Sequence, residues 1–100
     1  MVSEIIWSGR SIDTYNAIID YLLKEWTDKE IYNFATRVSD KLKILKLQPR
    51  IGMVVNKRQN IYRTLVHKRV TLVYHYKPLK KEIELVTFWQ NSQNPKRLKY

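Results

Sequence analysis

The stretch Gln48-Pro49-Arg50-Ile51-Gly52 decides the fold, because the spacing of apolar residues differs on its two sides. Before it, apolar residues recur every three or four positions, as they do along one face of a helix. After it, they alternate with polar residues, as in a strand that buries one face. Pro49 and Gly52 are residue types that end helices and form turns. The pattern therefore predicts a change from helix to sheet at this point.

The segment before this stretch is predicted to be a helix that starts at Asp28 and continues until Pro49. Thr27-Asp28-Lys29-Glu30 is a capping-box pattern, in which the Thr hydroxyl and the Glu carboxylate satisfy exposed backbone N–H groups. The apolar stripe of this helix is Ile31, Phe34, Val38, Leu42 and Leu45.

An earlier helix is predicted from Ser11 onward, with Ser8 or Ser11 as its N-cap. Its apolar stripe is Ile12, Tyr15, Ile19, Leu22 and Trp26. The link to the next helix is very short, which favours an antiparallel helical hairpin. Residues 2–7 are rich in β-forming side chains and predict a short first strand.

Three strands are predicted after the central stretch, over residues 61–66, 70–76 and 82–89. In the middle one, alternation places Val70, Leu72, Tyr74 and Tyr76 on one side. The order β-α-α-β-β-β predicts an α+β fold, with the N-terminal helical hairpin packed on a mostly antiparallel twisted sheet. We expect one domain over residues 1–100, with a basic tail at 90–100.

Positive charge is concentrated in the second half of the chain. Nineteen Lys and Arg against nine Asp and Glu give a formal net charge of +10. Residues 1–50 carry +1 and residues 51–100 carry +9, because Glu82 and Glu84 are the only acids there. We therefore expect the second half to contact an anionic or acidic target. The candidate contact residues are Lys57, Arg58, Arg63, Lys68, Arg69, Trp89, Lys96 and Arg97.

Several classes of protein are excluded or disfavoured by composition. No apolar run approaches the roughly 18 residues of a membrane span, so no membrane partner is expected. The N-terminus lacks the pattern of a secretory signal, and the chain has no cysteine, which fits a cytoplasmic location. Two histidines without cysteines do not suggest a zinc site, and no metal or cofactor is expected.

Most aromatic side chains fall on or beside the apolar stripes and are expected in the core. These are Trp7, Tyr15, Tyr21, Trp26, Tyr32 and Phe34. Trp89 and Tyr100 are better candidates for contact with a target, because they lie among basic and amide groups.

Five short segments occur in an order that resembles a known family. They are Ile5-Ile6-Trp7-Ser8, Ile18-Ile19-Asp20-Tyr21-Leu22, Pro49-Arg50-Ile51-Gly52, Leu72-Val73-Tyr74 and Ser92-Gln93-Asn94-Pro95. These segments are distributed over nearly the whole chain. By their order the chain resembles the RelE/ParE superfamily, the toxins of bacterial type II toxin–antitoxin modules. The resemblance implies a growth-inhibiting toxin that a cognate antitoxin neutralises. It also implies a target, either mRNA at the ribosome or DNA gyrase.

Cleavage of mRNA requires a base for the 2′-OH, cations for the phosphate and an acid for the leaving oxygen. In the RelE-like members a strand arginine lies three residues before the strand tyrosine, and here that position is Thr71. This difference favours a ParE-like inhibitor of gyrase. The alternative is a ribosome-dependent mRNA endonuclease, for which the candidate catalytic residues are Arg63, Lys68, Arg69, His75 and Tyr100. A third possibility is a non-toxic basic module that binds nucleic acid or protein.

Overall fold

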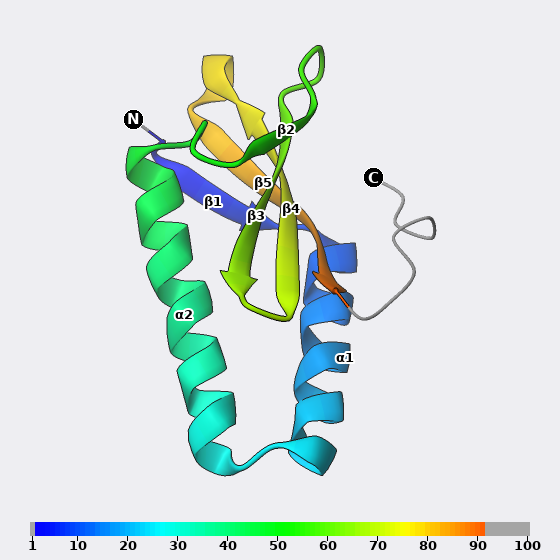
Figure 1. The fold of residues 1–100 in the computed structure, drawn as a ribbon. Coiled ribbons are helices and arrows are strands. Elements are labelled where there is room, and N and C mark those ends of the chain that lie inside the picture. Colours follow the sequence, from blue (N-terminus) through cyan, green and yellow to red (C-terminus); the bar gives the residue numbers. More distant parts are fainter. Residues whose placement is uncertain (1, 92–100) are drawn as a thin grey trace.

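A computed structural model of the chain gives the fold, and the structure describes residues 2–91. Two helices follow a first short strand, and four further strands complete one sheet (Figure 1). The elements are β1 (Glu4–Trp7), α1 (Gly9–Glu25), α2 (Asp28–Leu47), β2 (Met53–Asn56), β3 (Ile61–His67), β4 (Val70–Lys77), the short 3-10 helix η1 (Pro78–Lys80) and β5 (Glu82–Gln90).

The helix starts follow from the capping residues. Ser8 is the N-cap of α1, and its Oγ accepts a hydrogen bond from the backbone N–H of Ser11 at 3.0 Å. Thr27 caps α2, which begins at Asp28 as predicted. The capping box is complete, because Glu30 N–H donates to Thr27 Oγ1 and Thr27 N–H donates to Glu30 Oε1, both at 3.3 Å. These bonds satisfy backbone donors that have no partner inside the helix.

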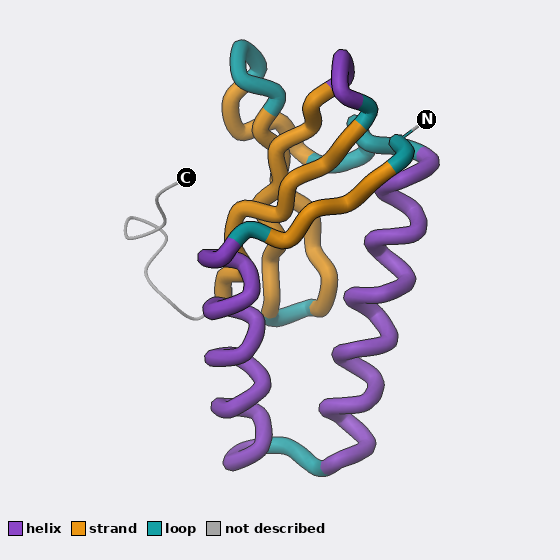
Figure 2. Tube along the Cα trace, turned by 180° about the vertical axis from the view of Figure 1, so that it is seen from behind, coloured by secondary structure: helices purple, strands orange, loops and turns teal. Residues whose placement is uncertain are grey.

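The sheet has the strand order β1-β5-β4-β3-β2. The β1 strand is parallel to β5, and the remaining pairs are antiparallel. The predicted α+β class, with the helices packed on a mostly antiparallel sheet, is therefore confirmed. In both views of the chain, the β3–β4 hairpin lies between the two helices (Figures 1 and 2).

The structure adds one strand that the sequence did not predict. The β2 strand has four residues, and it pairs with the start of β3, where Met53 is opposite Arg63. Its segment, Met53-Val54-Val55-Asn56, is too short to show alternation. A strand of this length forms because its neighbour supplies hydrogen-bonding partners, which is a tertiary effect.

The core contains the predicted face of β4, since Val70, Leu72 and Tyr74 are buried in it and Tyr76 packs against it. The predicted stripe of α1 needs a correction at Ile12, which is 46% exposed. Ser11 is fully buried instead, together with Ile18 and Leu22. The reason is that the first turns of α1 pack against a strand edge, where a small polar residue fits.

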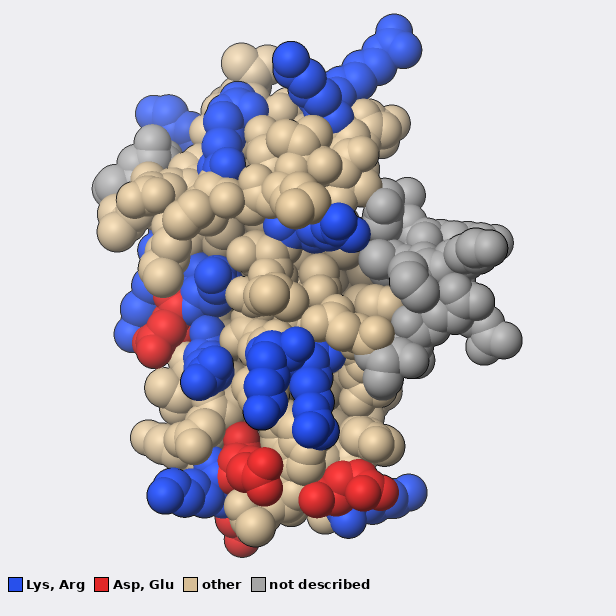
Figure 3. All heavy atoms as spheres, in the orientation of Figure 1, with Lys and Arg blue, Asp and Glu red and all other residues tan. Residues whose placement is uncertain are grey.

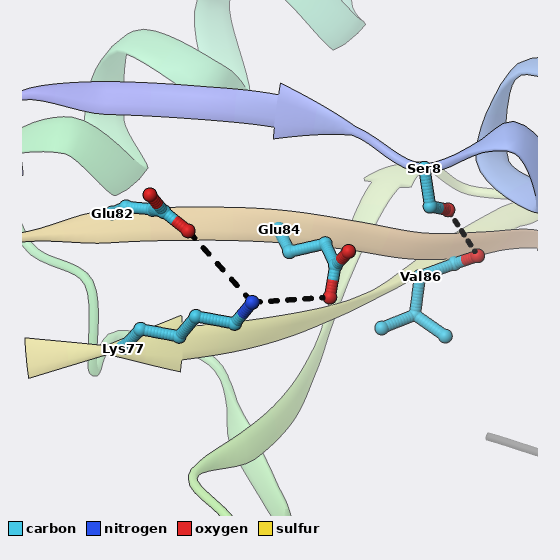
Figure 4. A network of polar contacts seen from close by, with 5 residues as sticks. All are labelled: Ser8, Lys77, Glu82, Glu84 and Val86. Atoms are coloured by element: carbon cyan, nitrogen blue, oxygen red, sulfur yellow. Dashed lines mark hydrogen bonds and ion pairs between the residues drawn. The ribbon is translucent and has the colours of Figure 1, made fainter. Parts of the chain in front are cut away.

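That strand edge belongs to β5, beyond the end of β1. Ser8 N–H donates to the carbonyl of Leu85 at 3.2 Å, and Ser8 Oγ donates to the carbonyl of Val86 at 3.2 Å (Figure 4). Further along, Phe88 N–H donates to Thr14 Oγ1 at 3.0 Å. Ser8 and the side chain of Thr14 on α1 therefore continue the hydrogen bonding that β1 began, so the edge of β5 is covered.

Two aromatic residues contradict the expectation of a core position. Tyr21 is 51% exposed and Tyr32 is 71% exposed. Each lies one position away from a buried or half-buried residue of its helix, so it points outward from the stripe. The other four aromatic residues on the stripes are in the core or packed against it, as predicted. Among residues 2–91, no helix is long and apolar enough to span a membrane.

Candidate functional site

The hydroxyl of Tyr74 joins the central stretch of the chain to the sheet. It donates a hydrogen bond to the carbonyl of Pro49 at 2.8 Å and accepts one from the backbone N–H of Gly52 at 3.1 Å. Burial raises the pKa of Tyr74 to about 12, and the bond from Gly52 opposes that shift. A phenol held in this way stays protonated, so its role is structural.

Gly52 is required at this position because there is no room for a side chain. A Cβ atom would lie 2.7 Å from the carbonyl oxygen of Arg63 and 2.7 Å from Tyr74 Oη. The backbone therefore approaches β3 closely, which fixes the point where β2 begins. This contact places Met53 opposite Arg63.

A shallow depression of about 500 Å³ surrounds Arg63. Its lining combines cationic, apolar and amide side chains: Lys41, Ile51, Gly52, Met53, Arg63, Thr64, Leu65, Thr71 and Asn91. Three of the apolar members are more exposed than is usual for such residues, namely Ile51 (50%), Met53 (62%) and Leu65 (56%). We call this surface the Arg63 depression.

Thr71 and Arg63 are brought together by the register of β3 and β4. Arg63 is opposite Val73, so Thr71 lies diagonally across from it on the same face of the sheet. The hydroxyl of Thr71 donates to Asn91 Oδ1 at 2.7 Å. The guanidinium of Arg63 lies 3.2 Å from the sulfur of Met53. The position that the resemblance associates with an arginine therefore lies beside an arginine of the neighbouring strand.

The two acids of the second half share one cation. Lys77 Nζ lies 3.7 Å from a carboxylate oxygen of Glu82 and 3.6 Å from one of Glu84 (Figure 4). Within residues 2–91, these are the only ion pairs. Other cations of the sheet half, including Arg63, therefore have no described carboxylate close enough to neutralise them.

The candidate contact residues do not form one patch. Lys57 and Arg58 lie in the loop between β2 and β3, whereas Lys68 and Arg69 lie in the turn between β3 and β4. These are opposite ends of β3, and Arg63 lies between them (Figure 1). On the face drawn in Figure 3, Lys and Arg are spread over the molecule, and most of the Asp and Glu lie at the end where the helices are joined.

His75 and Trp89 do not line the Arg63 depression. His75 is opposite Ile61 on β3 and Glu84 on β5, and it is half-buried. Trp89 is opposite Thr71 and lines a separate small hollow against α1. Lys96, Arg97, Tyr100 and the segment 92–95 of the resemblance lie outside the described residues.

Arg50 is a positioned cation that is not among the candidate site residues predicted from the sequence. Its Nη1 donates to Tyr62 Oη at 2.7 Å and to Asn60 Oδ1 at 3.1 Å. Its guanidinium also lies over the ring of Tyr76, 5.1 Å from the centroid. These partners come from β3, β4 and the loop between β2 and β3, so only the folded register reveals the cluster.

No group of three or more His, Cys, Asp or Glu within residues 2–91 is placed to hold a metal ion. Comparison with protein-family models and with curated proteins found no match. The fold therefore defines the protein only as a small α+β domain with two N-terminal helices on a five-stranded mixed sheet.

Proposed function

We propose that the protein is the toxin of a bacterial type II toxin–antitoxin module and inhibits growth in the cytoplasm. The basis is the order of the segments that resemble the RelE/ParE superfamily. Two of these segments are in direct contact, because Tyr74 bonds to both Pro49 and Gly52 across 25 and 22 positions. The serine of the first segment caps α1 and bonds to β5. The segments that resemble the family are thus joined to one another or to the sheet by hydrogen bonds. This supports a likeness in fold over a chance likeness in sequence.

The observation that carries the choice of target is the composition of the Arg63 depression. An arginine without a described carboxylate partner is framed by exposed Ile51, Met53 and Leu65. Arginine and methionine are enriched where proteins bind proteins, and exposed apolar patches mark such surfaces. A phosphate-binding surface is more polar and more densely cationic. We therefore assign the depression to a protein target, and we propose DNA gyrase as that target.

The arrangement of the candidate catalytic residues argues against the endonuclease. His75 lies across from Glu84, while Lys68 and Arg69 occupy the far end of β3. A general acid and base must both reach the reacting atoms within hydrogen-bonding distance. Among the described residues, Arg63, His75 and the pair Lys68 and Arg69 line three different hollows. Binding without hydrolysis accounts for this arrangement better.

The cognate antitoxin is the second partner of the proposed module. Its chemistry should complement a chain of net charge +10, so an acidic segment is expected. Apolar side chains of the antitoxin would add contacts that salt does not screen. Co-expression of an adjacent short gene that encodes such an antitoxin should therefore restore growth.

Induced expression in a bacterial host tests the proposal. We expect growth arrest, double-strand breaks in DNA and a DNA-damage response. Rapid loss of protein synthesis with cleaved transcripts would overturn the gyrase assignment in favour of the endonuclease. Normal growth, with the protein present in folded form, would overturn both toxin assignments and leave the non-toxic binding module.

A further inference from the structure

A third hollow, of about 400 Å³, lies between the end of α1 and the β3–β4 turn. This volume is within the usual range of small-molecule sites. Two aromatic side chains, Tyr21 and Trp26, line it from the helix side. Lys68 and Arg69 line it from the turn, and Gln90 and Asn91 add amide groups at the end of β5. Rings, cations and amides therefore converge on one place.

Asn91 holds the backbone of the turn that carries the two cations. Its backbone N–H donates to the carbonyl of Arg69 at 2.8 Å, and its Nδ2 donates to the carbonyl of Lys68 at 3.2 Å. Its Oδ1 accepts from Thr71, which anchors it to β4. The turn that carries Lys68 and Arg69 is thus bonded to the neighbouring strand at both residues. Such fixing reduces the entropy lost when a ligand binds.

The surroundings of the turn are electropositive. His67 packs between the rings of Trp26 and Phe34, 5.1 Å and 5.9 Å from their centroids. Burial lowers the pKa of His67, and the charges of Arg37, Lys68 and Arg69 lower it further, while Glu30 opposes them. Three cations, one from α2 and two from the turn, therefore act on the His67 imidazole, and a single acid opposes them.

We propose that this hollow, which we call the turn site, binds a nucleotide unit. Lys68 and Arg69 hold the phosphate, and the base lies against Tyr21, because the guanidinium of Arg69 already lies over the ring of Trp26, 6.0 Å from its centroid. Cations that hold a phosphate beside aromatic rings that stack on a base are the usual means of binding single-stranded nucleic acid. The same chemistry fits a free nucleotide. The site adjoins the Arg63 depression, with which it shares Asn91, but its cations and rings are different residues. The inference does not depend on the proposed function.

Binding to the purified full chain tests this inference. Two probes separate the sources: a fluorescently labelled six-nucleotide single-stranded DNA, followed by anisotropy, and ATP, followed by calorimetry. The double variant Lys68→Ala/Arg69→Ala removes both phosphate contacts. Lys43→Ala/Lys46→Ala is the matched control, because it removes the same charge from exposed positions on the last turns of α2. Tyr21→Ala removes a half-exposed ring without opening the core.

We expect at least one probe to bind, and Lys68→Ala/Arg69→Ala to weaken its binding at least about tenfold. For the oligonucleotide, the slope of log affinity against log salt should fall by about 0.7, since Lys68 and Arg69 hold one phosphate and each phosphate neutralised on a single strand contributes about 0.7. Tyr21→Ala should weaken binding while leaving that slope unchanged. Binding of the oligonucleotide alone assigns the site to nucleic acid, and binding of ATP assigns it to free nucleotides.

Two results would overturn the turn site. One is that neither probe binds to the folded wild-type chain. The other is that the control variant weakens binding as much as Lys68→Ala/Arg69→Ala, which would mean that only total charge matters. Thermal melts of every variant show whether each one is folded. Growth inhibition is measured separately in cells, so a failure here leaves the proposed function untouched.

Discussion

Tyr74 donates its hydroxyl hydrogen bond to the carbonyl oxygen of Pro49, 25 positions earlier in the chain. The same oxygen of Tyr74 accepts from Gly52, so one phenol fixes both ends of the stretch where helix gives way to sheet. This contact sets where β2 starts and hence where Arg63 meets Met53. The candidate site therefore depends on a bond made inside the core.

Tyr74→Phe should lower the free energy of unfolding by about 1–3 kcal/mol. The change leaves the Gly52 N–H and the Pro49 carbonyl without their partner in a part-buried position. Urea denaturation measures the effect. Tyr62→Phe is the control, because Tyr62 accepts its bond from Arg50, an exposed side chain that water can solvate. Equal losses in the two variants would show that the contact of Tyr74 has no special role.

Gly52→Ala should destabilise the fold by about 1–3 kcal/mol, because the added methyl group would overlap the Arg63 carbonyl and Tyr74 Oη. Gly9→Ala is the matched substitution. Nothing lies within 4 Å of a Cβ atom at Gly9, and alanine favours the helix there. The two melting temperatures should therefore move in opposite directions or differ clearly. A Gly52→Ala protein as stable as Gly9→Ala would contradict the close approach.

Thr14→Val should cost about 1–3 kcal/mol, because Phe88 N–H would lose the hydroxyl that accepts its hydrogen bond at the covered edge of β5. The valine keeps the shape of the threonine, so a loss reports on the hydroxyl. Thr14→Ser restores the hydroxyl and should recover most of the stability. Hydrogen exchange at Phe88 gives a local readout, with faster exchange expected in Thr14→Val only. Unchanged exchange in that variant would rule out the bond.

Protonation of His67 should destabilise the fold. Its pKa is lowered in the folded protein, chiefly by burial and then by Arg37, Lys68 and Arg69. The unfolded chain therefore takes up the proton more readily, and stability present above the ordinary His pKa of about 6.5 is lost as the pH falls through the folded value. The backbone N–H of Arg69 also donates to His67 Nδ1 at 3.2 Å, a bond that protonation of this atom would break.

The measurement is the free energy of unfolding of wild type and His67→Gln between pH 8 and pH 5, values chosen to bracket the ordinary histidine pKa. Wild type should lose more stability than the variant over this interval. The other titratable groups are the same in both proteins, so the difference isolates the histidine. If the free energy of unfolding fell equally with pH in the two proteins, the lowered pKa of His67 would be contradicted.

Local patterns predicted the elements whose signals lie within a few residues. The capping box placed the start of α2 at Asp28, and alternation placed the buried face of β4. The β2 strand was missed because its formation depends on β3 and on the bond from Tyr74. Ile12 was misassigned because helical spacing alone does not show that α1 packs its first turns against a strand edge.

The candidate site could be predicted only in part, because its residues are brought together by the pairing register of the strands. The sequence identified Arg63 and the unusual Thr71, but their diagonal placement depends on Arg63 lying opposite Val73. It also grouped Lys57 and Arg58 with Lys68 and Arg69, which the fold places at opposite ends of β3. Charge counted along a chain does not indicate which side chains share a surface.

The most direct test of the proposed function uses purified DNA gyrase and relaxed plasmid. Wild-type protein should block supercoiling and cause linear DNA to accumulate, and Lys24→Glu, an exposed change on α1, should act equally. Arg63→Glu should require at least about tenfold more protein, which corresponds to about 1.4 kcal/mol of binding free energy. Normal supercoiling with folded wild-type protein, or undiminished inhibition by Arg63→Glu, would contradict the account.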